Sequence, residues 1–186
     1  MGACSHVTAR VILAHGASGT AASMRPHVEG LRRRGVNASA IDIPKGSAER
    51  ALPVFRRHLD EAPSGTAVGG HSYGGRVASL LCAEQRGRMP SGLVLLSYPL
   101  HRPGHPEEAR TEHWPRVTCP VLLLSGEADP FARIELLRKA VDLLPDASLH
   151  TYPRVGHGLA PVLDDALDRI AEFIKGLAPA GPQDAS

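Results

Sequence analysis

Short apolar runs alternate with amphipathic segments along most of this chain. The apolar runs stand at residues 11–14, 38–43, 66–69, 93–97, 121–124 and 148–152. Several of them are unbroken, which is typical of parallel strands that are buried on both faces. In the segments between the runs, apolar residues recur at helical spacing, as Leu163, Leu167 and Ile170 do.

This alternation predicts the fold class. Strands that alternate with helices build βαβ units, whose strands run parallel and whose crossovers are right-handed. We therefore expect an α/β protein with about six parallel strands in a doubly wound sheet and helices on both faces. Ligands bind beyond the carboxyl ends of the strands in such sheets, so the residues that follow each strand are the candidates for function.

Local signals predict where several helices begin. Ser23 and Ser47 precede amphipathic segments and are suited to be N-caps. Asp129 stands before Pro130, which favours a further helix start at that point. Gly35 is expected to end the first of these helices.

The length and composition favour a single domain. The chain has 186 residues, of which 42% are hydrophobic and 22% charged, and both fractions are ordinary for a globular protein. We assign residues 1–176 to one domain and expect 177–186, rich in Pro, Ala and Gly, to be a disordered tail. A net charge of +2 is too small to indicate nucleic acid or a membrane surface as a partner.

The cysteines bear on the cellular compartment. Cys4, Cys82 and Cys119 are odd in number and lack the spacing of a metal site, which favours reduced thiols. No signal-peptide pattern and no apolar run of membrane-spanning length is visible. We therefore expect a cytoplasmic protein. The sequence leaves open whether it is a monomer or a homodimer.

Residues 70–74, Gly-His-Ser-Tyr-Gly, form a G-x-S-x-G pattern between an apolar run and a helix-like run. That context is typical of a nucleophile elbow, in which a sharp turn lifts the serine hydroxyl off the end of a strand. The glycines two residues before and two after the serine let strand and helix approach each other closely. The pattern predicts Ser72 as a nucleophile.

An acid and a histidine follow later strands in the order of an α/β-hydrolase triad. Asp129 comes after the fifth apolar run, and His157 after the sixth. His157 would take the proton of Ser72, and Asp129 would fix the imidazole tautomer. The alternative for Asp129 is a helix N-cap, and the two roles are compatible.

The remaining site assignments concern the oxyanion and the substrate. We expect the backbone N–H groups of Tyr73 and of Ala17, in the loop after the first strand, to bind the oxyanion. We assign Ser18, His101 and His113 as substrate contacts.

A metal site is the competing interpretation of the histidine-rich stretch. His101, His105 and His113 stand near Glu107 and Glu108, but their spacing matches no strong metal motif. The glycine-rich stretch 16–19 also lacks the spacing of a phosphate-binding loop. We therefore expect neither a metal nor another cofactor.

From about Val7 to Gly176 the chain resembles a small α/β-hydrolase fold protein. It is most similar to the family of testis-expressed protein thirty and NSL complex subunit three, with their bacterial relatives. The residues that carry this resemblance are 13–17, 70–75, 97–104, 110–113 and 125–131. The Tyr-Pro-Leu-His…Pro-Gly stretch within 97–104 is the most specific to the family. The resemblance implies a hydrolase without a settled substrate.

Residues 101–119 stand where many α/β-hydrolases carry a cap domain, and this stretch is too short for one. We expect a minimal α/β-hydrolase fold with no cap and an exposed site. The function that follows is a serine hydrolase that cleaves a small ester or thioester through an acyl-enzyme. Two alternatives stay open. One is an acyltransferase, and the other is a non-catalytic interaction module, because a fold does not guarantee turnover.

Overall fold

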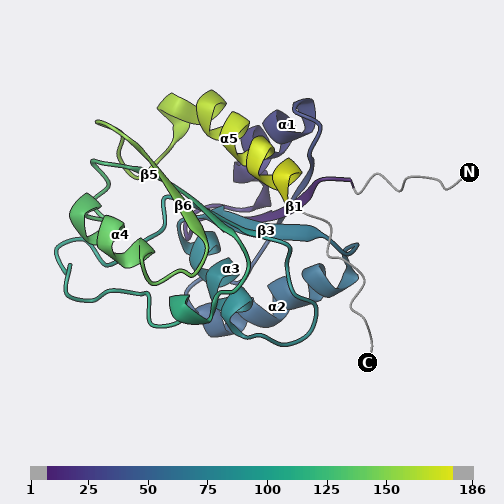
Figure 1. Ribbon diagram of the computed structural model, residues 1–186, viewed down its shortest axis with the longest axis horizontal. Helices are drawn as coiled ribbons and strands as arrows, with labels where there is room; N and C mark the ends of the chain where they lie inside the picture. Colours follow the sequence, from purple (N-terminus) through teal and green to yellow (C-terminus); the bar gives the residue numbers. More distant parts are fainter. Residues whose placement is uncertain (1–7, 178–186) are drawn as a thin grey trace, which may run out of the picture.

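The computed structural model describes residues 8–177. Six parallel strands form one sheet in the order β2-β1-β3-β4-β5-β6 (Figure 1). The strands are β1 (Arg10–Ala14), β2 (Asn37–Ile41), β3 (Thr66–His71), β4 (Leu93–Leu96), β5 (Val121–Gly126) and β6 (Ala147–Tyr152). The predicted α/β class and the parallel sheet are confirmed.

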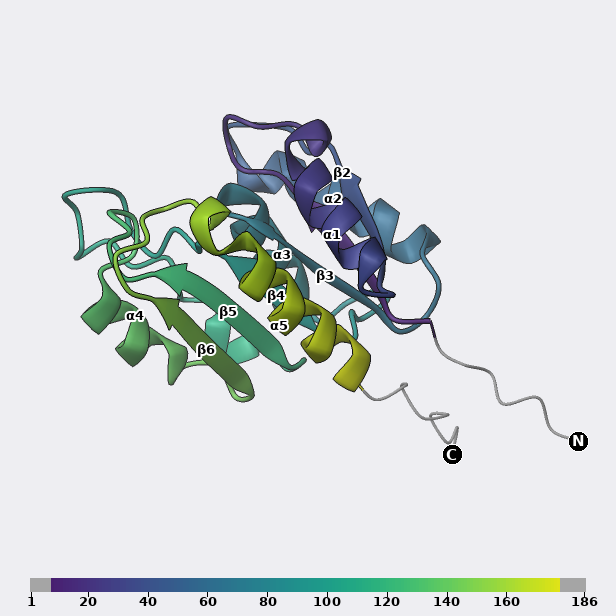
Figure 2. The same cartoon turned by 90° about the horizontal axis from the view of Figure 1, so that it is seen from above.

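Helices cover both faces of the sheet, as predicted. One face carries α1 (Arg25–Arg33) and α5 (Leu163–Gly176), and the other carries α2 (Ala48–Glu61), α3 (Tyr73–Ala83) and α4 (Ile134–Val141) (Figures 1 and 2). Each face has its own apolar core, which burial of aliphatic side chains stabilises by roughly 25 cal/mol per Å² of apolar area. Short 3₁₀ turns are η1 (Ala21–Met24), η2 (Trp114–Arg116) and η3 (Ala160–Val162).

The strand order reverses next to β1. The chain passes from β1 to its neighbour β2 and then returns to β3 on the other side of β1. The two connecting helices, α1 and α2, therefore lie on opposite faces of the sheet (Figure 2). This arrangement opens a crevice at the carboxyl ends of β1 and β3, where doubly wound sheets bind ligands.

No α-helix interrupts residues 97–120, all of which the structure describes, so the predicted absence of a cap is confirmed. The stretch is instead packed onto the core by aromatic side chains. The ring centroids of Tyr98 and Trp114 lie 5.0 Å apart, and both residues are buried. The Tyr98 hydroxyl donates to the Arg110 carbonyl at 2.5 Å, which ties the two ends of the loop together.

Two predicted helix starts are wrong. Ser23 is part of η1, and its hydroxyl donates to the Thr20 carbonyl, so α1 has Met24 at its N-cap. α4 begins at Ile134, because residues 129–132 form a turn around the Asp129 carboxylate. Ser47 does stand at the N-cap of α2, although its hydroxyl donates to Glu49.

Cys82 and Cys119 are buried and do not form a disulfide. Cys4 and residues 178–186, which make up most of the predicted disordered tail, lie outside the described residues. None of the helices in the described part of the chain has the length and hydropathy needed to cross a membrane.

Candidate active site

Ser72 stands on a sharp turn between β3 and α3. Its backbone has φ 51° and ψ −116°, a conformation that residues other than glycine rarely adopt. Its N–H donates to the Leu96 carbonyl at 2.8 Å, which fixes the turn against β4. Gly70 allows the tight packing, since a Cβ on this residue would lie 2.5 Å from the Ala14 carbonyl oxygen.

Ser72, His157 and Asp129 form one chain of hydrogen bonds. The Ser72 hydroxyl lies 2.8 Å from Nε2 of His157. Nδ1 of His157 lies 2.8 Å from Oδ2 and 3.0 Å from Oδ1 of Asp129. The three residues follow β3, β6 and β5, and the parallel topology brings them to one edge of the sheet.

The Asp129 carboxylate is buried and held from two sides. It is 3% exposed, and its Oδ1 accepts the Phe131 N–H at 2.8 Å. A carboxylate accepts only, so it orients His157 with the proton on Nδ1 and leaves Nε2 free to accept from Ser72. Glu127, the other acid in this loop, instead contacts Arg138 and Thr151.

Aromatic rings enclose the His157 imidazole on two sides. The ring centroid of Phe131 lies 4.3 Å away and that of His71 lies 5.3 Å away. Nε2 of His71 lies 3.2 Å from the His157 carbonyl oxygen. Burial lowers the pKa of His71 and favours its neutral form. Because a carbonyl oxygen can only accept, Nε2 is the nitrogen that carries the proton.

The loop after β1 is held in place by His15. Its Nδ1 lies 2.7 Å from the Gly16 carbonyl oxygen, and its Nε2 accepts the Ile43 N–H at 3.2 Å. This loop carries Ala17, which is exposed. Within residues 8–177, the N–H groups of Ala17 and Tyr73 donate to no protein acceptor. Both amides are therefore available to a ligand.

The three predicted substrate contacts lie in different surroundings. Ser18 lines a cavity of about 350 Å³ that also includes His27, His71 and Leu159. His101 is 1% exposed, and both ring nitrogens are occupied, by the Arg102 carbonyl at 2.8 Å and the Arg133 N–H at 3.1 Å.

His113 is 4% exposed and lies 2.8 Å from the Ser79 hydroxyl on α3. Burial lowers the pKa of His113 to about 4. Both buried histidines hydrogen-bond from this loop to a neighbouring segment, His101 to Arg133 and His113 to Ser79 on α3. These contacts favour a bracing role for His101 and His113 over the predicted contact with substrate.

The histidine-rich stretch brings three possible metal ligands together. Among the described residues, His105, Glu107 and Glu108 are the only such group within reach of one ion, and all three are exposed. Glu108 is already paired with Arg102 through Nε and Nη2. Exposed charged side chains are stable in water without a bound metal ion, so this group gives no reason to propose a metal site.

Two residues beside Ser72 were not predicted. His71 supports the loop of His157, and its place within the G-x-S-x-G pattern was a signal available in the sequence. Ser97 follows β4 and also has a left-handed backbone, with φ 48°. Its hydroxyl is buried and has no partner among the described residues, and nothing in the sequence pattern marks this.

Several solved structures share this fold. A monoacylglycerol lipase from Paleococcus ferrophilus aligns with a TM-score of 0.76 and 18% identity over 91% of this chain and 95% of its own. An esterase from Exiguobacterium antarcticum aligns with a TM-score of 0.76 and 12% identity over 90% of this chain and 92% of its own.

Est1E from Butyrivibrio proteoclasticus, in a structure that holds ferulic acid, aligns with a TM-score of 0.66. It is 20% identical over 89% of this chain and 86% of its own. At these identities the likeness concerns the fold. The family model described as "Alpha/beta hydrolase domain" matches residues 7–175, nearly the whole chain. The protein therefore belongs to the α/β-hydrolase domain family.

Proposed function

We propose that this protein is a serine hydrolase that cleaves a small ester or thioester through an acyl-enzyme. The observation that carries the proposal is the hydrogen-bonded chain from the Ser72 hydroxyl through His157 to the buried Asp129. A serine hydroxyl is a weak nucleophile at neutral pH, and an adjacent neutral imidazole is the group that activates it.

The reaction proceeds in two halves. Ser72 Oγ attacks the carbonyl carbon while its proton passes to Nε2 of His157. The N–H groups of Ala17 and Tyr73 stabilise the oxyanion that forms. The C–O or C–S bond then breaks, and the leaving group takes the proton from His157. Water repeats the sequence on the acyl-enzyme and releases the acid.

The open site favours small or flexible substrates. No α-helix covers Ser72 from the stretch between β4 and β5, each residue of which the structure describes. The fold is shared with a monoacylglycerol lipase and with esterases, which supports an ester as the substrate class. Transfer of the acyl group to an acceptor other than water uses the same first half-reaction. The narrower resemblance to the family of testis-expressed protein thirty stays a prediction.

Labelling with a fluorophosphonate tests the proposal. We expect the intact mass of the wild type to rise by one adduct and that of Ser72→Ala to stay unchanged. Ser97→Ala is the matched control, because Ser97 is the other serine with a left-handed backbone and is expected to leave labelling intact. An unlabelled wild type that is folded by circular dichroism would contradict the proposal and favour a non-catalytic interaction module.

A further inference from the structure

Arg76 lies in the first turn of α3, directly behind the proposed nucleophile. Its N–H donates to the Ser72 carbonyl at 3.1 Å. Helical side chains lean toward the N-terminus of their helix, so we expect the Arg76 side chain to lie over the first turn of α3, where its charge acts on Tyr73. A cation in the first turn opposes the helix dipole, and no acidic residue stands in this turn to offset it.

Arg110 is brought to the same end of α3 by the loop between β4 and β5. Its N–H donates to the Leu100 carbonyl at 2.8 Å, and its carbonyl accepts the Tyr98 hydroxyl. Three residues later, His113 lies 2.8 Å from the Ser79 hydroxyl, which itself donates to the Arg76 carbonyl. The loop therefore runs along α3 beside Arg76.

Both guanidinium groups lack an acidic partner. Among residues 8–177, neither Arg76 nor Arg110 forms an ion pair or donates a side-chain hydrogen bond, and Nε of Arg76 is buried without any partner. The charge of Glu49 acts on Arg76 and that of Glu108 acts on Arg110, but Glu49 accepts its hydrogen bond from Ser47 and Glu108 accepts from Arg102. Burial lowers the pKa of Arg110, and the charge of Arg76 lowers that pKa further.

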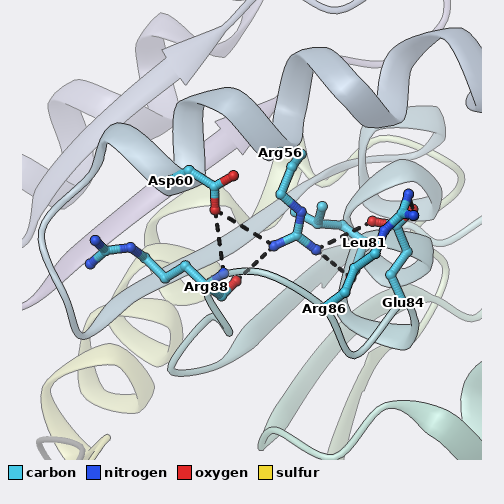
Figure 3. Close-up of polar contacts among 6 residues, drawn as sticks. All are labelled: Arg56, Asp60, Leu81, Glu84, Arg86 and Arg88. Atoms are coloured by element: carbon cyan, nitrogen blue, oxygen red, sulfur yellow. Dashed lines mark hydrogen bonds and ion pairs between the residues drawn. The ribbon is translucent and has the colours of Figure 1, made fainter.

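The arginine cluster at the other end of α3 is built differently. Arg56 donates to the carbonyls of Arg88 and Leu81 and pairs with Glu84, and it also lies near Asp60 (Figure 3). A cavity of about 650 Å³ lies there, and on its wall Arg56 pairs with Glu84 and Asp60 while Arg86 pairs with Glu84. Arg34 and Arg56, which are both half-buried, are thus paired with acids, whereas the half-buried Arg76 and Arg110 are not.

We propose that Arg76 and Arg110 together form a subsite for an anionic group on the substrate, next to Ser72. This inference rests on the proposed function. Two cations that repel each other and lack a carboxylate are stabilised when an anion binds between them, and guanidinium groups bind carboxylate and phosphate oxygens. The substrate class is an ester or thioester that carries a second, negatively charged group, either a carboxylate or a phosphate.

Selectivity between matched esters is the first test. We compare kcat/KM for the 4-nitrophenyl monoester of glutaric acid with that for 4-nitrophenyl valerate, which has a similar chain without the carboxylate. The wild type should prefer the charged ester. Arg76→Gln and Arg110→Gln should each lower this preference by about tenfold to a hundredfold, the usual loss for a charged hydrogen bond. Arg116→Gln, an exposed arginine of the same loop, is the charge-matched control and should keep the preference.

Binding to Ser72→Ala separates the subsite from the chemistry. Calorimetry with glutarate, valerate and inorganic phosphate should show heat for glutarate or phosphate and none for valerate, and the stronger of the two identifies the anion. Arg110→Gln in the same background should abolish that heat. Anion binding without turnover in the wild type would overturn the proposed function and leave the subsite standing. Equal turnover of both esters, with no anion binding, would overturn the subsite.

Discussion

The two ends of α3 use arginine in opposite ways. At the C-terminal end, Arg56 is held by the carbonyls of Leu81 and Arg88 and by Glu84. Cations at the end of a helix are also favoured by its dipole. At the N-terminal end, Arg76 opposes the dipole. The Nε of both arginines is buried without a partner, but only Arg56 has acceptors for its terminal nitrogens among the described residues. The contacts of Arg56 stabilise the fold, whereas the guanidinium donors of Arg76 are left free to bind an anion.

The same contrast extends to the backbone. The described residues around Ser72 include a strained turn and two free N–H groups. Strain and unsatisfied groups persist where function maintains them, because each costs about 1 to 3 kcal/mol of stability. The comparison therefore separates substitutions that remove activity from substitutions that remove stability.

The largest effect is expected for the hydrogen-bonded chain. Ser72→Ala and His157→Ala should each lower kcat toward a reactive ester by about 10⁴- to 10⁶-fold, because a triad acts as a unit. The double variant should be no slower than either single one. Steady-state kinetics measures the loss, and urea unfolding should give free energies close to the wild type. Single variants whose losses multiply would contradict a shared role.

Arg56→Met tests the structural end of α3. We expect the free energy of unfolding to fall by about 1 to 3 kcal/mol, because the carbonyls of Leu81 and Arg88 lose a charged donor and Glu84 keeps only its exposed partner Arg86. Adding Glu84→Gln should restore part of that loss. Arg76→Met should cost little, since the wild-type guanidinium has no acid to lose. Chemical denaturation of the four proteins measures these values, and an equal loss for Arg56→Met and Arg76→Met would remove the contrast between the two ends.

How far the sequence predicts this molecule depends on the range of the interactions involved. The strands were predicted to within two residues at either end, because a buried parallel strand is marked by its own apolar run. The helix starts at Ser23 and Pro130 were wrong, because a 3₁₀ turn and a carboxylate-centred turn replaced the expected caps. Capping signals in the local sequence do not fix where a helix begins when such contacts compete with them.

The site follows the same rule. Ser72, Asp129 and His157 could be proposed together because each follows a strand and parallel strands end at one edge. The bracing contacts of His101 and His113 could not be predicted, because burial among backbone and hydroxyl partners leaves no periodic signal in a loop. Arg76 was not singled out at all. The lack of an acidic partner is a property of the folded chain that one sequence does not reveal.

His113, packed on the middle of α3, predicts how stability depends on pH. Its pKa is lowered to about 4 by burial, from an ordinary value of 6.5 in the unfolded chain. Between pH 4 and 6.5 this histidine is protonated in the unfolded chain but neutral in the folded one. Its contribution to the free energy of unfolding is therefore fully present above pH 6.5 and is lost as the pH drops toward 4. The slope is at most about 1.4 kcal/mol per pH unit for one group.

His113→Gln should remove this part of the slope and keep a side chain that can bond to Ser79. Urea unfolding between pH 4 and 7 provides the measurement. His27, whose pKa is also lowered to about 4 by burial, is the comparison, and His27→Gln should flatten the slope by a similar amount. A slope that neither substitution changes would show that other groups govern the acid sensitivity.

The smallest expected effect concerns the strain at Ser72. Glycine tolerates φ 51° and ψ −116° without a Cβ clash, so Ser72→Gly should raise the free energy of unfolding by about 1 kcal/mol. Ser72→Ala keeps the Cβ and should gain little, which makes it the matched control. Both variants lack the hydroxyl and should be inactive. If thermal and urea unfolding find Ser72→Gly no more stable than Ser72→Ala, the turn stores no strain, and the N-terminal end of α3 differs from the C-terminal end in its charges alone.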